Sequence, residues 1–146
     1  MPSAPSPPEA PRWELYAHGA DVGIRGSGAT LAAAFEGIGL ALTASVTDLT
    51  TVTPQQLVGI HCTAADVDGL LYEWVNALVY EMATRHMLFS RYRVSIAGTQ
   101  LDAEAWGEPL DAPRHQPAVE VKGATYTDLR VASAGGRWTA QCIIDV

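Results

Sequence analysis

The sequence has 146 residues, a length typical of one domain because domains usually contain about 100–200 residues. Nine Lys and Arg residues against 16 Asp and Glu residues give a formal net charge of −7, which repels phosphate backbones and argues against autonomous nucleic-acid binding. No apolar stretch approaches the ~18 residues that a transmembrane helix requires, so we expect no membrane partner. Only Cys62 and Cys142 could form a disulfide, and a domain of this length does not need one, which favours a reducing, cytoplasmic location.

The first eleven residues differ in composition from the rest of the chain. Five of the nine prolines fall within residues 2–11. Proline fixes φ and removes a backbone donor, and this segment offers few side chains that could pack in a core. We therefore predict a disordered tail over residues 1–11 and one folded domain over residues 12–146.

The folded part begins with two short predicted strands, over residues 13–16 and 21–24. Residues 18–20 (His-Gly-Ala) between them predict a turn or irregular bend. The Gly-Ser-Gly sequence at residues 26–28 then interrupts the strand pattern. We expect a tight turn there, followed directly by a helix.

Two helices are predicted from apolar residues at helical spacing. Thr30 can cap a helix over residues 31–45, because its hydroxyl can accept from the first free N–H groups. Residues 57–62 suit a mostly buried strand. Asp66 is then a good N-cap for a second helix that ends near His86. One broad apolar face marks this second helix, made by Leu70, Leu71, Trp74, Val75, Leu78, Val79 and Met82.

The remaining residues alternate in the manner of antiparallel strands. The predicted strands cover residues 92–96, 101–106, 119–131 and 138–146, with a hairpin turn at Gly135 and Gly136. The fold class predicted for the whole chain is α+β, with two helices packed on one or two mainly antiparallel sheets.

Common catalytic and metal-binding motifs are missing from the sequence. The glycines of residues 23–28 lack the Gly-Lys-Ser/Thr end of a P-loop and the third glycine of a dinucleotide fingerprint. Four histidines and two cysteines show none of the short spacings of a structural zinc site. No Gly-x-Ser-x-Gly or catalytic cysteine signature is present. These observations do not favour an enzyme.

Three acidic groups nevertheless fall at conspicuous places. Asp21 follows the predicted bend, and Asp145 stands beside Val146, whose α-carboxylate adds a second negative group at the same point. Such a pair either stays solvated or collects a cation that offsets the repulsion. If the first and last strands pair, the three groups could converge and suit a hard cation such as Ca²⁺ or Mg²⁺. The alternative for Asp21 is a turn-capping role.

Several motifs in the same order and spacing resemble one known family, the archeases. The resemblance covers nearly the whole chain after residue 12. It is carried by HGADVGI at residues 18–24, LLYEWVNALVYEMATRHMLFSRYRV at residues 70–94, Gly107-Glu108 followed by His115, EVKGATYTDLRV at residues 120–131 and the final Ile144-Asp145-Val146.

The resemblance implies a function and a partner. Archeases are accessory proteins of RtcB-type RNA ligases, the GTP-dependent enzymes that join RNA ends in tRNA splicing and RNA repair. By resemblance, this protein is not itself an enzyme. It is expected to promote guanylylation of the ligase and its repeated turnover, without direct binding of nucleic acid.

The resemblance also implies a site. The metal ligands of the family fall on Asp21, Asp145 and Val146, with Ca²⁺ the expected ion and Mg²⁺ or Mn²⁺ the alternatives. A family lysine falls on Lys122, a functional candidate near the metal whose alternative is a solvated strand lysine. Two positions depart from the family pattern: a motif histidine is Thr127 here, and the threonine after the first motif histidine is Gly19.

Two other functions remain open on the residues alone. One is a stand-alone metal-dependent hydrolase in which Asp21 and Asp145 hold the metal and Lys122 or Glu120 transfers a proton. The other is a general chaperone-like binding protein that needs no metal.

Overall fold

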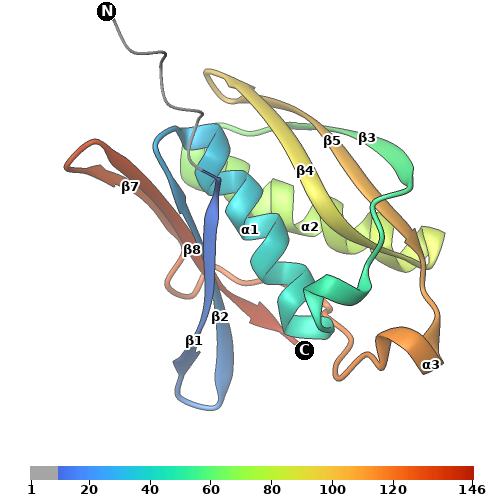
Figure 1. Cartoon of the computed structure of the whole chain (residues 1–146). Helices are drawn as coiled ribbons and strands as arrows, with labels where there is room; N and C mark the ends of the chain where they lie inside the picture. Colours follow the sequence, from blue (N-terminus) through green and yellow to red (C-terminus); the bar gives the residue numbers. More distant parts are fainter. Residues whose placement is uncertain (1–9) are drawn as a thin grey trace, which may run out of the picture.

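The computed structural model describes residues 10–146, so the prediction of a disordered tail falls almost entirely on residues outside the described part of the chain. Two antiparallel sheets lie on either side of two long helices (Figure 1). This arrangement confirms the predicted α+β class, with both helices packed on antiparallel sheets. The core lies between the sheets, where both helices bury their apolar side chains.

The larger sheet contains Asp21, near the start of the sequence, and Asp145, near its end. Its strands are β1 (Arg12–His18), β2 (Asp21–Gly28), β6 (Gly123–Ala124), β7 (Arg130–Ala134) and β8 (Arg137–Asp145). The order is β1-β2-β8-β6, and β7 also pairs with β8. The strand β8 is therefore central, with β2 on one side and the two short strands on the other (Figure 1).

The smaller sheet has the order β3-β5-β4 and covers the opposite side of the helices. Its strands are β3 (Gln56–Thr63), β4 (Met87–Ala97) and β5 (Gln100–Pro109). The helical segments are α1 (Leu31–Val46), α2 (Val67–Arg85), the short α3 (Ala112–His115) and the 3-10 turn η1 (Leu49–Thr51). Neither long helix in the described part of the chain is apolar over a length that would cross a membrane.

Helix α1 begins where the sequence predicts it, but the segment before it is a strand. The Thr30 hydroxyl accepts a hydrogen bond from the Ala33 N–H at 3.0 Å, which confirms the predicted cap. The predicted turn at residues 26–28 is wrong, since β2 extends to Gly28. A Cβ atom on Gly26 would lie 2.2 Å from the Ala34 carbonyl oxygen, so a glycine is needed there for α1 to approach the sheet closely.

Helix α2 confirms the second predicted helix. The Asp66 carboxylate accepts from the Gly69 N–H at 2.7 Å, and the helix ends at His86, which has a φ of 53° in the left-handed region. The apolar face of α2 is buried from Leu70 to Leu78, whereas Val79 and Met82 are half-buried. The Trp74 indole N–H donates to the Phe35 carbonyl at 2.9 Å. This hydrogen bond joins the two helices in the core and satisfies the one polar atom of the tryptophan side chain.

The predicted single strand over residues 119–131 is wrong. Residues 119–122 are not in a strand, and the two short strands β6 and β7 pair with β8 in registers that differ by three residues. Residues 125–129 form the extra loop between them, with Asp128 at a φ of 53°. Alternation of apolar and polar residues does not reveal such an insertion, because both short strands keep the same two-residue period.

The other predicted strands are confirmed in position and are longer than expected at one or both ends, except that β8 ends at Asp145. The turn at Gly135 and Gly136 is also confirmed, and both glycines have positive φ values, 59° and 77°. Positive φ at both central residues is the requirement of a tight hairpin of this type. The short elements η1 and α3 have no counterpart among the predicted helices.

Candidate functional site

The candidate acidic residues meet at one end of the larger sheet. His18 pairs with Asp21 across the β1–β2 turn, and Val22 pairs with Ile144 across β2 and β8. Continuing the second register by one residue places Asp21 opposite Asp145. Directly opposed residues of an antiparallel pair extend from the same face, with Cβ atoms about 4.5–5.5 Å apart. The register therefore brings two carboxylates together from distant parts of the sequence.

The other side of β8 completes this end of the sheet. Gly123 pairs with Asp145, and the Lys122 N–H donates to the Asp145 carbonyl oxygen at 2.7 Å. Lys122 thus reaches the same point of the sheet through its backbone, next to Val146. Asp21, Lys122, Asp145 and Val146 are all exposed. We refer to Asp21, Asp145 and Val146 as the acidic end.

The carboxylates of the acidic end lack partners in the described part of the chain. Within residues 10–146, the Asp21 and Asp145 side chains accept no hydrogen bond and form no ion pair. Arginines of the same sheet lie toward its other end: Arg25 is four residues from Asp21 along β2, about 13 Å away. That separation exceeds the Debye length of about 8 Å at physiological salt, so Arg25 does not neutralise the carboxylates.

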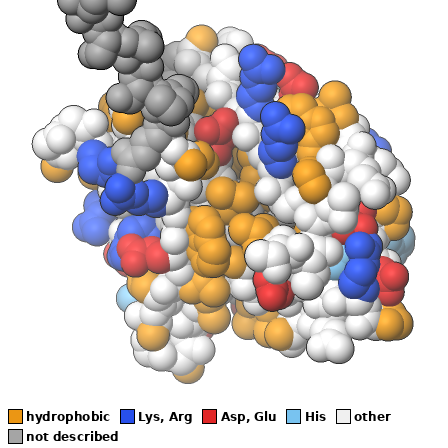
Figure 2. Space-filling model, in the orientation of Figure 1, with side chains coloured by type: hydrophobic (Ala, Val, Ile, Leu, Met, Phe, Trp, Pro, Cys, Tyr) orange, Lys and Arg blue, Asp and Glu red, His pale blue; other side chains and the backbone are white. Residues whose placement is uncertain are grey.

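The surface of the larger sheet is consequently uneven in charge. Basic side chains are visible over the β1, β7 and β8 side of the molecule and not at the β1–β2 turn below them (Figure 2). The larger sheet has four arginines in its strands: Arg12 in β1, Arg25 in β2, Arg130 in β7 and Arg137 in β8. Among the described residues, Lys122 is the one lysine or arginine that the strand register places at the acidic end, so the two aspartates leave a local excess of negative charge there.

The donor chemistry of the acidic end fits a hard divalent cation. Two carboxylates in register supply the oxygen ligands that Ca²⁺, Mg²⁺ and Mn²⁺ prefer. In residues 10–146 no three His, Cys, Asp or Glu side chains come together as a metal site. Any further protein ligand at the acidic end would therefore be a main-chain oxygen or the Val146 carboxylate that the family resemblance implies.

The two departures from the family pattern lie beside this end of the sheet. Gly19 has a φ of 60° in the β1–β2 turn, a conformation that glycine adopts without steric cost. Thr127 is exposed, and its carbonyl oxygen accepts from the Ile143 N–H at 3.2 Å. Gly19 therefore shapes the turn beside the site, and a main-chain hydrogen bond from Ile143 fixes Thr127 whatever its side chain.

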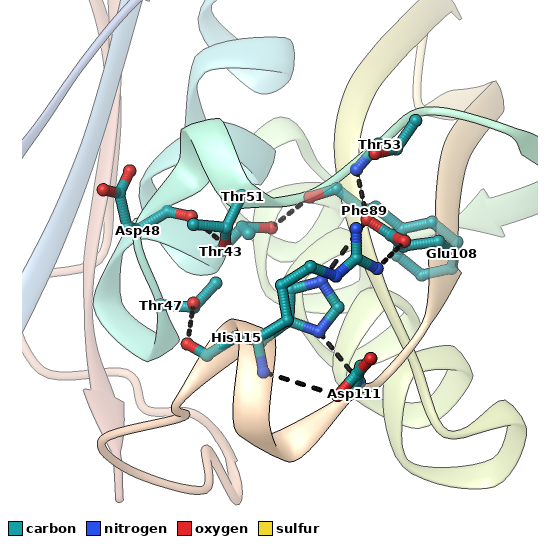
Figure 3. A network of polar contacts seen from close by, with 10 residues as sticks. Thr43, Thr47, Asp48, Thr51, Thr53, Phe89, Glu108, Asp111 and His115 are labelled. Carbon is teal, nitrogen blue, oxygen red and sulfur yellow. Dashed lines mark hydrogen bonds and ion pairs between the residues drawn. The ribbon is translucent and has the colours of Figure 1, made fainter.

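A second polar network surrounds Glu108, far from the acidic end in the fold. Glu108 is only 4% exposed, at the end of β5. Its carboxylate accepts from the Thr53 N–H, from Arg114 and, at 3.3 Å, from Nε2 of the fully buried His115 side chain. Figure 3 shows Thr53 and His115 on two sides of Glu108. Every group in this network has a partner.

The protonation states in the network follow from its contacts. The Asp111 N–H donates to Nδ1 of His115 at 2.9 Å, so the tautomer that satisfies both contacts carries its proton on Nε2 and donates it to Glu108. Burial alone raises the pKa of Glu108, but the hydrogen bonds from Thr53, Arg114 and His115 outweigh that effect and lower the pKa to about 2. Glu108 is therefore a buried carboxylate ion.

This network fastens the segment that leads to Lys122. The Thr47 hydroxyl donates to the His115 carbonyl at 2.5 Å, and the Ala118 N–H donates to the Val46 carbonyl at 2.8 Å. Together they attach residues 110–118 to the end of α1. The sequence contained Glu108 and His115 as part of the family resemblance but gave no role for them. Their partner Thr53 lies 55 residues away, which no local spacing could indicate.

The cysteines and Glu120 are not part of the acidic end. Cys62 and Cys142 are buried free thiols on different sheets. A groove of about 490 Å³ lies between the end of α2 and residues 117–121, and its lining is mainly apolar. Glu120, the proton-transfer candidate of the hydrolase hypothesis, lines this groove rather than pairing with β8 beside Asp145. The groove and the acidic end are separate features.

Comparison with known proteins gives a consistent result. The model of the archease protein family matches residues 13–146. The protein archease of Thermococcus gammatolerans is 38% identical over 140 residues, which cover 92% of this chain and 99% of that protein. The protein archease of Pyrococcus abyssi is 35% identical over the same shares of the two chains.

Solved structures agree with this match. The solution structure of Methanobacterium thermoautotrophicum protein 1598 has a TM-score of 0.81 and 28% identity, covering 92% of this chain and 98% of that one. A crystal structure described as an archease and possible chaperone from Thermotoga maritima has a TM-score of 0.55 at 14% identity, over 100% of both chains. The second likeness concerns the fold alone.

Proposed function

The chain belongs to the archease family, and on that premise we propose that it is an accessory protein that activates an RtcB-type RNA ligase in tRNA splicing or RNA repair. It would promote guanylylation of the ligase and multiple turnover without joining RNA itself. The free thiols of Cys62 and Cys142 are consistent with action in the cytoplasm.

One observation carries this proposal: the register of β2 and β8 sets Asp21 opposite Asp145, and neither carboxylate has a partner in the described residues. Exposed carboxylates held side by side repel each other, so the arrangement costs free energy unless something outside the chain compensates. A divalent cation or a basic partner surface would supply that compensation. The arrangement is therefore what a docking and metal-presenting site requires.

The residues of the acidic end have separate tasks in this proposal. Asp21 and Asp145 would hold the cation, with the terminal carboxylate of Val146 as a third ligand. Lys122, fixed by its backbone bond to Asp145, would bind anionic groups of the nucleotide or ligase beside the metal. When bound, Ca²⁺, Mg²⁺ or Mn²⁺ supplies positive charge that stabilises phosphate oxygens. The net charge of −7 favours fast association with a basic, RNA-binding enzyme.

The test is a guanylylation time course of the cognate ligase with GTP, with and without this protein. We expect multiple turnovers only in its presence, and we expect Asp21→Asn to abolish the gain. A ligase that turns over equally well without the protein would contradict the proposal. Hydrolysis of a nucleotide or phosphoester by the purified protein alone would favour the metal-dependent hydrolase instead.

A second candidate function rests on the groove beside α2. Its apolar lining and its volume of about 490 Å³ would suit an apolar segment of a client protein, as in a general chaperone. Suppression of aggregation of several unrelated proteins, unchanged by a metal chelator and by Asp21→Asn, would favour this function over a dedicated activator.

A further inference from the structure

Two tyrosines form an exposed aromatic stack beside the acidic end. The rings of Tyr72, on α2, and Tyr126, in the loop between β6 and β7, lie 4.3 Å apart between centroids and are inclined by 8°. Tyr126 is nevertheless 72% exposed. The stack therefore holds the Tyr126 ring in one orientation while leaving most of its surface open to a partner.

A carboxylate stands next to this stack on α2. Glu73 follows Tyr72 on α2 and is exposed. Loss of hydration raises the pKa of the Tyr126 phenol, and the neighbouring Tyr72 and the negative charge of Glu73 raise it further. In the described part of the chain, Glu73 forms no ion pair. The face of an exposed tyrosine ring attracts a cation, and an unpaired carboxylate nearby adds to that attraction.

The stack belongs to the same region as the acidic end. The Thr125 N–H donates to the Ile143 carbonyl at 3.0 Å, and the Ile143 N–H donates to the Thr127 carbonyl at 3.2 Å. Tyr126 is thus fixed on both sides against β8, and Ile143 is only two residues, about 7 Å, from Asp145. A partner that covers the acidic end would also reach the stack.

We infer that the Tyr72–Tyr126 stack and Glu73 form a second contact with the protein partner and receive an arginine side chain from it. A guanidinium group is planar and weakly hydrated, so it can lie on the Tyr126 ring while it pairs with the Glu73 carboxylate. The identity of the partner as the ligase rests on the proposed function. The expectation of an arginine at this contact is independent of the proposed function.

The surrounding charges favour a basic protein over RNA as the occupant. A nucleic-acid base could also stack on Tyr126, but its phosphates would approach Glu73, Asp145 and Asp21, in a chain of net charge −7. Arginine is attracted by all of these groups. Tyrosine and arginine are also the residues most enriched among the strongest contacts of protein interfaces.

The first experiment measures the affinity of the full chain for the ligase by calorimetry. We expect Tyr126→Ala to weaken binding about tenfold and Glu73→Gln about fivefold, whereas Tyr126→Phe keeps the ring and changes the affinity less than about threefold. Tyr80→Ala is the matched control, since Tyr80 is 63% exposed on the same helix and outside the stack. Thermal unfolding of each variant verifies that it is folded.

The second experiment separates this inference from the proposed function. A tetra-arginine peptide and a tetra-lysine peptide are titrated into the protein while the ring signals of Tyr126 are followed by NMR. We expect larger shifts with the arginine peptide, and their loss in Glu73→Gln. Absence of that preference, unchanged ligase affinity of Tyr126→Ala alongside normal activation, or a Tyr126-dependent affinity for single-stranded RNA would each overturn the inference. A ligase that fails to bind while the arginine preference persists would contradict only the proposed function.

Discussion

Two carboxylate clusters of this protein stand in opposite physical situations. Glu108 is almost completely buried, and its oxygens accept from Thr53, Arg114 and His115. Asp21 and Asp145 are exposed and accept nothing from the described residues, although the sheet register sets them face to face. Glu108 therefore has its hydrogen-bond partners within the described chain, whereas the side chains of Asp21 and Asp145 have none there.

The difference separates structure from function within one small domain. A buried carboxylate persists as an ion only when hydrogen bonds offset the loss of hydration, and its partners then become part of the fold. Exposed carboxylates held in register need no partner for stability, so their arrangement is available for a ligand. Both clusters are built on carboxyl side chains, Glu108 in one and Asp21 with Asp145 in the other. Burial and partners determine the role.

The largest effect on activation is expected when the acidic end is neutralised. We expect Asp145→Asn to reduce ligase activation about 100-fold, because it removes one of the two opposed aspartates from the proposed cation site. The melting temperature should stay the same or rise slightly, since a like-charge repulsion is relieved. Asp102→Asn, an exposed strand aspartate of the other sheet, is the control. A large loss of stability in Asp145→Asn would show that the acidic end is structural.

The reverse behaviour is expected at Glu108. Glu108→Gln should lower the free energy of unfolding by about 2–3 kcal/mol, because it weakens charge-assisted hydrogen bonds in a buried network. Chemical denaturation measures this change. Activation per folded molecule should remain near that of the unmodified protein, and a specific loss of activation in a fully folded variant would contradict the structural role of Glu108.

The pH dependence of stability also tests the structural role of Glu108. The pKa of Glu108 is lowered to about 2 in the folded protein, below its ordinary value of 4.5. Its contribution to stability is therefore fully present above pH 4.5 and is lost as the pH falls from 4.5 toward 2. We expect urea midpoints measured over this range to fall less steeply in Glu108→Gln than in the unmodified protein.

The terminal carboxylate can be tested separately from the two aspartates. A short Gly-Ser extension after Val146 converts its carboxylate to an amide and should lower activation about fivefold, less than the loss of an aspartate, because the two opposed aspartates both remain. Isothermal titration with Ca²⁺ should show a parallel loss of affinity. Equal activation and affinity in the extended protein would remove Val146 from the ligand set.

The smallest expected effect concerns the outer part of the buried network. Thr47→Val keeps the side-chain shape and removes the donor to the His115 carbonyl, which should cost about 1 kcal/mol of stability. Thermal unfolding measures this change. A loss as large as that of Glu108→Gln would mean that the segment over residues 110–118 is held mainly by Thr47 rather than by Glu108.

The sequence allowed the helices and the fold class to be predicted because their signals are local. Thr30 and Asp66 precede apolar residues at helical spacing, and both caps are present in the structure. The strand at Gly26 and Gly28 was missed because glycine normally weakens strands, and the reason for it, close contact with α1, is a tertiary one.

The candidate site could be predicted only in part for the same reason. Asp21 and Asp145 stood out by their positions, yet their juxtaposition depends on a strand pairing that no spacing encodes. The loop over residues 125–129 shifts the register by three residues and brings Tyr126 onto α2, which alternation along the strand could not indicate. Hydrogen bonds across the fold, such as those of Glu108, are likewise invisible in the sequence.

The central position of β8 has a consequence for folding. The strand β2 (Asp21–Gly28) pairs with β8 (Arg137–Asp145), more than 100 residues away, so the larger sheet has a high contact order. Asp21 cannot meet Asp145 until this long-range pairing has formed. An unfolded or misfolded chain would therefore present no paired carboxylates, and only the folded molecule would present the acidic end to a ligand.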